Sequence, residues 1–114
     1  MVILSALDGK ILDTLPIGRG TDGSAFNPKT MEAFSSQGDG TLTVIKENSP
    51  TSFGVEQNLG TMPSAKTMTL DGKTGRIFLI AAEFGPPPAP PQPGGRGGRG
   101  QLIADSFTIL VVGK

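Results

Sequence analysis

The chain has 114 residues with ten basic and ten acidic side chains, so its formal net charge is zero and no global field attracts nucleic acid or an anionic membrane. It contains no Cys and no His, which excludes disulfides, thiolate nucleophiles, Ser-His-Asp catalysis and every His-bound metal. Its 17 Gly and 10 Pro, with only 36% hydrophobic residues, favour many turns and few long helices.

The N-terminal region predicts a β-hairpin. Residues 2–6 are expected as one strand and residues 11–17 as the next, with a turn at Asp8-Gly9-Lys10 between them. The region has no basic segment at its start and reaches Asp8 early, so we expect no signal peptide. No apolar run approaches the roughly 20 residues of a membrane span, so no membrane partner is expected.

An internal repeat with a spacing of 44 residues follows the hairpin. Residues 24–34 align with residues 68–78, and each copy predicts a strand, a tight turn and a second strand. The turns begin with Asn27-Pro28 and Asp71-Gly72, which supply the backbone angles that a chain reversal requires.

The repeat extends beyond these two hairpins. The same spacing matches Asp39 with Glu83, and residues 41–45 resemble residues 106–110 once a Pro/Gly-rich insertion at residues 85–101 is skipped. A repeat of about 40 to 45 residues with four short strands is typical of a β-propeller blade.

Blade strands are named a to d from the inside outward, and the chain divides into three parts on this interpretation. Residues 1–19 form a half blade with strands c and d, residues 20–62 a full blade, and residues 63–114 an incomplete blade without strand d. The expected strands of the two larger parts are residues 24–26, 33–36, 41–46 and 55–59, then 67–70, 76–82 and 107–112. A β-sandwich made of similar hairpins is the alternative.

Three motifs resemble the repeat of YVTN-type β-propeller proteins: Ile17-Gly18-Arg19-Gly20, Ala25-Phe26-Asn27-Pro28-Lys29-Thr30 and Gly40-Thr41-Leu42-Thr43-Val44. The last part of the chain looks like the C-terminal end of such proteins in soil bacteria. The resemblance implies a propeller fold used as a binding scaffold, and function is not implied because one fold serves many purposes. The family is usually exported, whereas this chain shows no export signal, so its compartment is left open.

A chain of about two blades is too short to close a propeller, which typically needs four to eight. Exposed blade faces and sheet edges favour association. We therefore expect an all-β, incomplete β-propeller of four-stranded antiparallel blades, closed by homo-oligomerisation as a trimer or tetramer. The half blade is expected to complement the missing strand d of another copy by strand addition.

The Pro/Gly-rich insertion at residues 85–101 is interpreted as a loop between strands b and c of the last blade. Its Pro half favours polyproline II structure and its Gly half a flexible coil. Alternatively, the Pro tract docks into an aromatic groove, and Arg96 and Arg99 contact nucleic acid. Two Arg residues in a neutral chain do not favour a nucleic-acid partner.

Carboxylates and cations are the remaining candidates for chemistry. Asp22, Asp39 and Glu83 are candidate metal ligands, because loops that enter strand a and leave strand b lie at one propeller face. With Lys66 they are also the catalytic candidates, and Arg19 and Lys66 are candidates to bind a small anionic ligand. Mn²⁺, Mg²⁺, Ca²⁺ or Zn²⁺ would be the cofactor. The structural alternative is that the two Asp residues fill turns and Glu83 is a solvated loop residue.

Two functions follow from these observations. The first is a self-assembling β-propeller fragment that acts as a binding or structural module, motivated by the missing blades. The second is a minimal metal-dependent hydrolase, similar to a phosphodiesterase, with a carboxylate site at the oligomer axis or interface.

Overall fold

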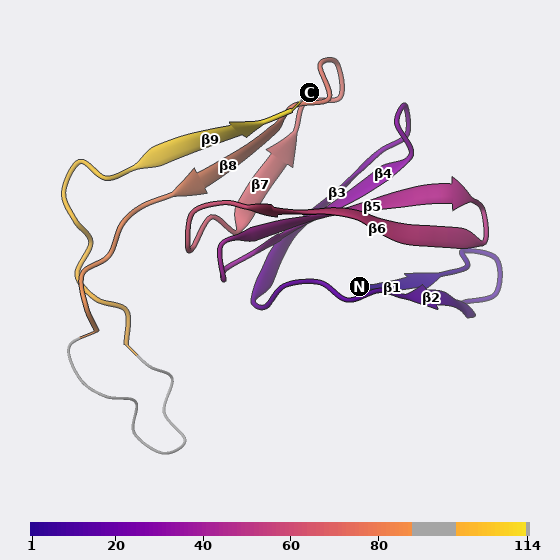
Figure 1. Cartoon of the computed structure of the whole chain (residues 1–114), viewed down its shortest axis with the longest axis horizontal. Coiled ribbons are helices and arrows are strands. Elements are labelled where there is room, and N and C mark those ends of the chain that lie inside the picture. Colours follow the sequence, from indigo (N-terminus) through magenta and orange to yellow (C-terminus); the bar gives the residue numbers. More distant parts are fainter. Residues whose placement is uncertain (88–97, 114) are drawn as a thin grey trace.

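The fold is entirely antiparallel β-structure, as the sequence predicted (Figure 1). The computed structural model describes residues 1–87 and 98–113, whose named strands form three sheets. A membrane-spanning helix is absent from these ranges. The first sheet contains β1 (Val2–Leu4) and β2 (Ile11–Thr14). The middle sheet contains β3 (Thr21–Asn27), β4 (Glu32–Gln37), β5 (Thr41–Ser49) and β6 (Ser52–Gly60), and the third contains β7 (Thr67–Leu70), β8 (Ile77–Ala81) and β9 (Thr108–Val112).

The three sheets follow one another in chain order, with the middle sheet between the other two (Figure 1). In each sheet, strands that are adjacent in sequence are also adjacent in space. The first strands of the middle and third sheets, β3 and β7, lie against each other, and β2 approaches β6. The chain is therefore a row of three meander sheets stacked through their faces.

The register of strand pairing confirms the 44-residue repeat. Four consecutive pairs between β3 and β4 recur between β7 and β8, and every residue is shifted by 44 positions. The first of these pairs is Gly23↔Ser36, repeated as Thr67↔Ile80, and the last is Phe26↔Ala33, repeated as Leu70↔Ile77. The two hairpins are therefore equivalent residue by residue.

A shared irregularity shows that the first sheet corresponds to the outer half of the middle sheet. In both hairpins the register shifts at the same place, so that one residue of the second strand is skipped. The pairs around the shift are Ile3↔Asp13 then Leu4↔Ile11 in the first sheet, and Val44↔Gln57 then Ile45↔Val55 in the middle sheet. On this register β1 is equivalent to residues 43–45 of β5, and β2 is equivalent to residues 55–58 of β6.

One predicted alignment was wrong by two residues. Thr41 pairs with Gln37, and Thr108 pairs with Ala81, which is 44 positions after Gln37. Residues 41–45 therefore correspond to residues 108–112 and not to 106–110. A shift of two residues keeps the alternation of side chains between the two faces, so the sequence pattern alone does not reveal it.

The predicted insertion begins and ends in paired backbone. The Gly85 N–H donates to the Gln101 carbonyl at 2.7 Å, and the Ile103 N–H donates to the Glu83 carbonyl at 2.9 Å. An isolated antiparallel bridge between Phe84 and Leu102 lies between these bonds. Residues 88–97, which include most of the Pro tract and Arg96, lie outside the described residues.

The hydrophobic core lies between the middle and third sheets. Leu42 and Leu79 are fully buried there, and Phe34 is 6% exposed. The remaining buried members are Ala65, Ile77 and Ala81, with partly buried side chains from β5 to β9 packed around them. Burial of these apolar side chains is the main attraction that holds the two sheets together.

We predict that Leu42→Ala lowers the free energy of unfolding by about 2–5 kcal/mol, because it leaves a cavity in this core. Since the chain has no Trp or Tyr, urea unfolding is followed by far-UV circular dichroism at a fixed protein concentration. Leu7→Ala is the control, because Leu7 is 99% exposed and its truncation should change the value by less than about 0.5 kcal/mol. Equal losses in both variants would place the core elsewhere.

Candidate functional site

The five predicted site residues lie at one end of the sheets. Arg19 precedes β3 and Lys66 precedes β7, whereas Asp39 and Glu83 follow the ends of β4 and β8. Because neighbouring strands are antiparallel, the beginning of a first strand and the end of a second strand meet at the same edge. Asp22 differs from the prediction: it lies inside β3, at the register irregularity between Thr21 and Gly23, and not before the strand.

Asp22 and Lys66 join the middle sheet to the third. The Lys66 Nζ atom lies 3.6 Å from Asp22 Oδ1, and both side chains are partly exposed. The Thr67 hydroxyl donates a hydrogen bond of 2.9 Å to Asp22 Oδ2. Both carboxylate oxygens of Asp22 therefore have partners, and the charge of Lys66 is balanced by its neighbour. A partly exposed pair of this kind contributes little stability by itself.

Asp39 binds the segment that leads from the first sheet into the middle one. The Arg19 N–H donates to Asp39 Oδ2 at 2.6 Å, and the Thr41 hydroxyl donates to Asp39 Oδ1 at 2.6 Å. The Thr41 hydrogen bond, with the Arg19 N–H and the Arg19 charge, holds the pKa of Asp39 below its ordinary value. A Cβ atom at Gly18 would overlap the Thr41 hydroxyl, so glycine is required where this segment passes the carboxylate.

Glu83 lies apart from the two Asp residues at the start of the insertion. Its backbone N–H donates to the Ser106 hydroxyl at 3.0 Å, and its exposed side chain borders an open cavity of about 380 Å³. Across residues 1–87 and 98–113, no group of three or more acidic side chains is placed to hold a metal ion. The described residues of one chain therefore do not bring Asp22, Asp39 and Glu83 together as a three-carboxylate site.

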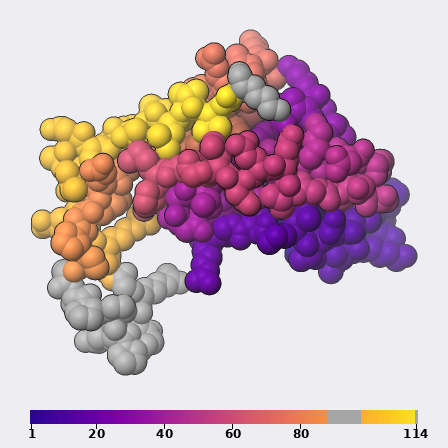
Figure 2. Space-filling view, viewed as in Figure 1, coloured from indigo at the N-terminus to yellow at the C-terminus, as the bar shows by residue number. Residues whose placement is uncertain are grey.

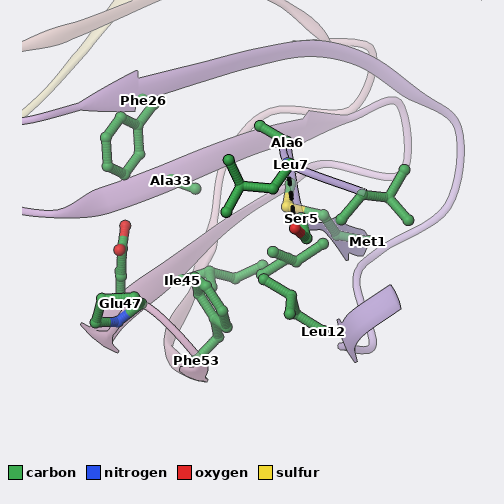
Figure 3. A pocket seen from close by; sticks show the side chains of 13 residues that line it. Met1, Ser5, Ala6, Leu7, Leu12, Phe26, Ala33, Ile45, Glu47 and Phe53 are labelled. Atoms are coloured by element: carbon green, nitrogen blue, oxygen red, sulfur yellow. Dashed lines mark hydrogen bonds between the residues drawn. The ribbon is translucent and has the colours of Figure 1, made fainter. Parts of the chain in front are cut away.

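An apolar cavity that was not predicted from the sequence lies beside the N-terminal hairpin. It has a volume of about 420 Å³ and lies between the first sheet and the middle sheet (Figure 3). Phe26, Ala33 and Ile45 line it from the middle sheet, and Met1 and Leu12 line it from the hairpin. On the opposite face of the middle sheet a second cavity, of about 330 Å³, lies against the third sheet and is lined by Phe34, Val44, Ile77 and Val112.

The outward face of the third sheet is apolar, and within residues 1–87 and 98–113 no other sheet covers it. Ile109 is 58% exposed, Val111 56% and Ile80 42%, and Phe78 is on the same face because it alternates with the buried residues of β8. In the space-filling view β9 lies on the surface along the edge of the molecule (Figure 2). The outward face of the first sheet is also apolar, with Val2 and Ile11 more than half exposed. Leu4 is 56% exposed and also borders the cavity between the first and middle sheets.

The sequence carried a signal for these faces. The strands Val2-Ile3-Leu4, Ile77-Phe78-Leu79-Ile80-Ala81 and Thr108-Ile109-Leu110-Val111-Val112 are apolar on both sides. Continuous apolar strands are typical of sheets that are buried on both faces. In this chain each of these strands has one covered face only.

Arg99 is the one residue of the proposed nucleic-acid pair that the structure describes. Its guanidinium lies 5.7 Å from the centroid of the Phe84 ring, a cation–π contact at the base of the insertion. Arg96 lies outside the described residues. The described part of the chain therefore presents Arg99 packed on an aromatic ring of its own chain.

Comparison with known proteins identifies no relative. No protein-family model, no curated protein and no solved structure matches this chain. The resemblance to YVTN-type propellers accordingly stays a proposal.

We predict that the free energy of unfolding falls on acidification, and that Asp39→Asn reduces this fall. The lowered pKa of Asp39 means that its ionised form stabilises the folded chain at neutral pH, and this stabilisation is lost as the pH falls through the lowered folded-state pKa. Urea unfolding at neutral and acidic pH measures the difference. Glu83→Gln is the control, because no described residue donates a hydrogen bond to the Glu83 carboxylate, and it should follow the unaltered chain. An unchanged pH dependence in Asp39→Asn would contradict the anchoring role.

Proposed function

We propose that this chain is a self-assembling module of the β-propeller type, which acts as a binding or structural unit through the faces of its end sheets. One observation carries the proposal: the stack of three sheets has an uncovered apolar face at each end. An apolar face of several neighbouring side chains on a soluble chain marks an interaction surface.

The internal repeat supports this interpretation. Phe34, Ser36 and Leu42 of the middle sheet are at most 6% exposed because the third sheet covers them. Their equivalents in the third sheet are Phe78, Ile80 and Ile109, and two of these are 42% and 58% exposed. The same positions are thus buried where a sheet lies over them and open where none does. A further sheet over the third one would restore equivalence.

The balance of buried and exposed side chains supports association as well. Within the described residues, seven hydrophobic residues are buried, whereas thirteen large hydrophobic residues are exposed. A single chain therefore leaves much of its apolar surface in water, and association would remove part of it. Because the net charge is zero, there is no net charge repulsion between copies of the chain.

The hydrolase alternative has less support. Its catalytic candidates Asp22, Asp39 and Lys66 are each engaged within one chain, and the described residues offer no three-carboxylate site. No observation on a single chain favours it over assembly. It also predicts that a metal ion holds copies together, which assembly through apolar faces does not.

The test is the mass of the unaltered chain in solution by light scattering. We expect a discrete oligomer of the 11.7 kDa chain whose mass is unchanged by EDTA and by about 1 M NaCl, because apolar contacts are not screened by salt. A monomer at all concentrations would contradict the proposal. Dissociation by EDTA would favour the metal-dependent alternative.

A further inference from the structure

We infer that the outward face of the third sheet packs on the outward face of the first sheet of a second copy, head to tail, so that two chains close a ring of six sheets. This inference rests on the proposed self-association and names the two surfaces that meet. It is carried by the residue equivalences between the sheets.

The outward faces of the first and third sheets correspond to the two surfaces that meet between the middle and third sheets within one chain. Through the shared register, Val2 and Leu4 of β1 are equivalent to Thr43 and Ile45 of β5, and these are equivalent to Leu110 and Val112 of β9. The third sheet packs on the middle sheet through Leu110 and Val112. The first sheet carries the apolar residues Val2 and Leu4 at the equivalent positions of its outward face.

The existing interface shows what those positions contact. Leu110 and Val112 pack against the core that contains Phe34 and Leu42, with Val44 beside them. The outward face of the third sheet repeats this surface with Phe78, Ile109 and Val111. In a second copy, Val2 and Leu4 therefore meet a surface equivalent to the one that Leu110 and Val112 cover within the chain.

Gly23 bears on whether a two-stranded or a four-stranded sheet packs on the outward face of the third sheet. Gly23 allows the close approach of β7, because a Cβ atom there would meet the side chain of Met68. The equivalent residue of β7 is Thr67, which has a Cβ atom and whose hydroxyl is already bonded to Asp22. An approach as close as that of β7 to Gly23 is therefore not expected here, which favours a partner that lacks inner strands. The first sheet satisfies this condition because it corresponds only to the outer half of the middle sheet.

The number of sheets sets the number of copies. Each chain contributes three stacked sheets, so two copies give six, within the four to eight blades of typical propellers, and three copies give nine. A trimer or tetramer was expected because the number of strands corresponds to about two blades per chain. If each stacked sheet occupies the place of one blade, a dimer is predicted instead. Such a closed ring has a twofold axis, and residue 4 of each copy meets residue 111 of the other.

The experiment uses the absence of native Cys. Leu4→Cys and Val111→Cys place single thiols on the two outward faces, and both native side chains are more than half exposed, so the variants are expected to fold, which circular dichroism checks. A short bis-maleimide spans the roughly 10 Å between packed sheets. We expect covalent dimers in the equimolar mixture, at least tenfold more than with either variant alone. Leu7→Cys mixed with Val111→Cys is the matched control, because Leu7 is 99% exposed in the turn after β1.

The double variant Leu4→Cys/Val111→Cys tests ring closure. Two links per pair of chains should stop the reaction at the covalent dimer, whereas an open head-to-tail chain would give a ladder of larger products. Preferential cross-linking of Val111→Cys with itself would overturn the head-to-tail arrangement. An oligomer by light scattering without cross-linking in the mixture would overturn this inference and leave the proposed self-association standing. A monomer by light scattering would remove both.

Discussion

The packing of one apolar sheet face on another is the interaction on which the rest of the structure depends. The described residues form no helix and no disulfide, and the ion pairs Lys10–Asp8 and Lys66–Asp22 lie at the surface. What holds the middle and third sheets together is the apolar layer around Leu42 and Leu79. A sheet that is apolar on both faces needs a neighbour on each side. The middle sheet has two neighbours, and the first and third sheets have one each, so the uncovered faces follow directly from the same constraint that makes the fold.

The polar edge of the stack serves this packing. Asp22 and Lys66 bridge the beginning of β3 to the segment before β7, and the Ser36 hydroxyl donates to the Lys66 carbonyl at the same junction. Asp39 fixes the segment that connects the first and middle sheets. Each of these contacts sets how closely one sheet approaches the next. The residues that looked like candidates for metal chemistry are therefore, within one chain, the residues that fix the junctions between sheets.

Much of the fold was readable from the sequence because its turns and its period are local features. Asn27-Pro28 and Asp71-Gly72 mark equivalent turns, and the 44-residue spacing recurs in the strand pairing. The equivalence of β5 and β9 was misplaced by two residues, since alternation is unchanged by an even shift. Arg19 comes near Asp39 because the β3–β4 pairing continues beyond Thr21↔Gln37, and the Asp39 N–H donates to the Arg19 carbonyl. The sequence predicted this first strand only from residue 24, so it did not place the two residues side by side. The apolar strands predicted that some sheet faces would need a partner. Which faces are left open could be seen only from the order of the sheets in the structure.

The arrangement of first strands argues for assembly over metal chemistry in the proposed ring as well. Only the middle and third sheets of each copy contribute an innermost strand, β3 or β7, because the first sheet corresponds to outer strands. A ring of two copies would place two Asp22–Lys66 pairs near its axis, and each pair carries its own balancing charge. Hard divalent cations need several carboxylate or carbonyl oxygens that converge without such neutralisation. Ring closure therefore places neutral Asp22–Lys66 pairs near the axis and does not create a concentrated negative site. What a second copy adds is the burial of the apolar faces that a single chain leaves exposed.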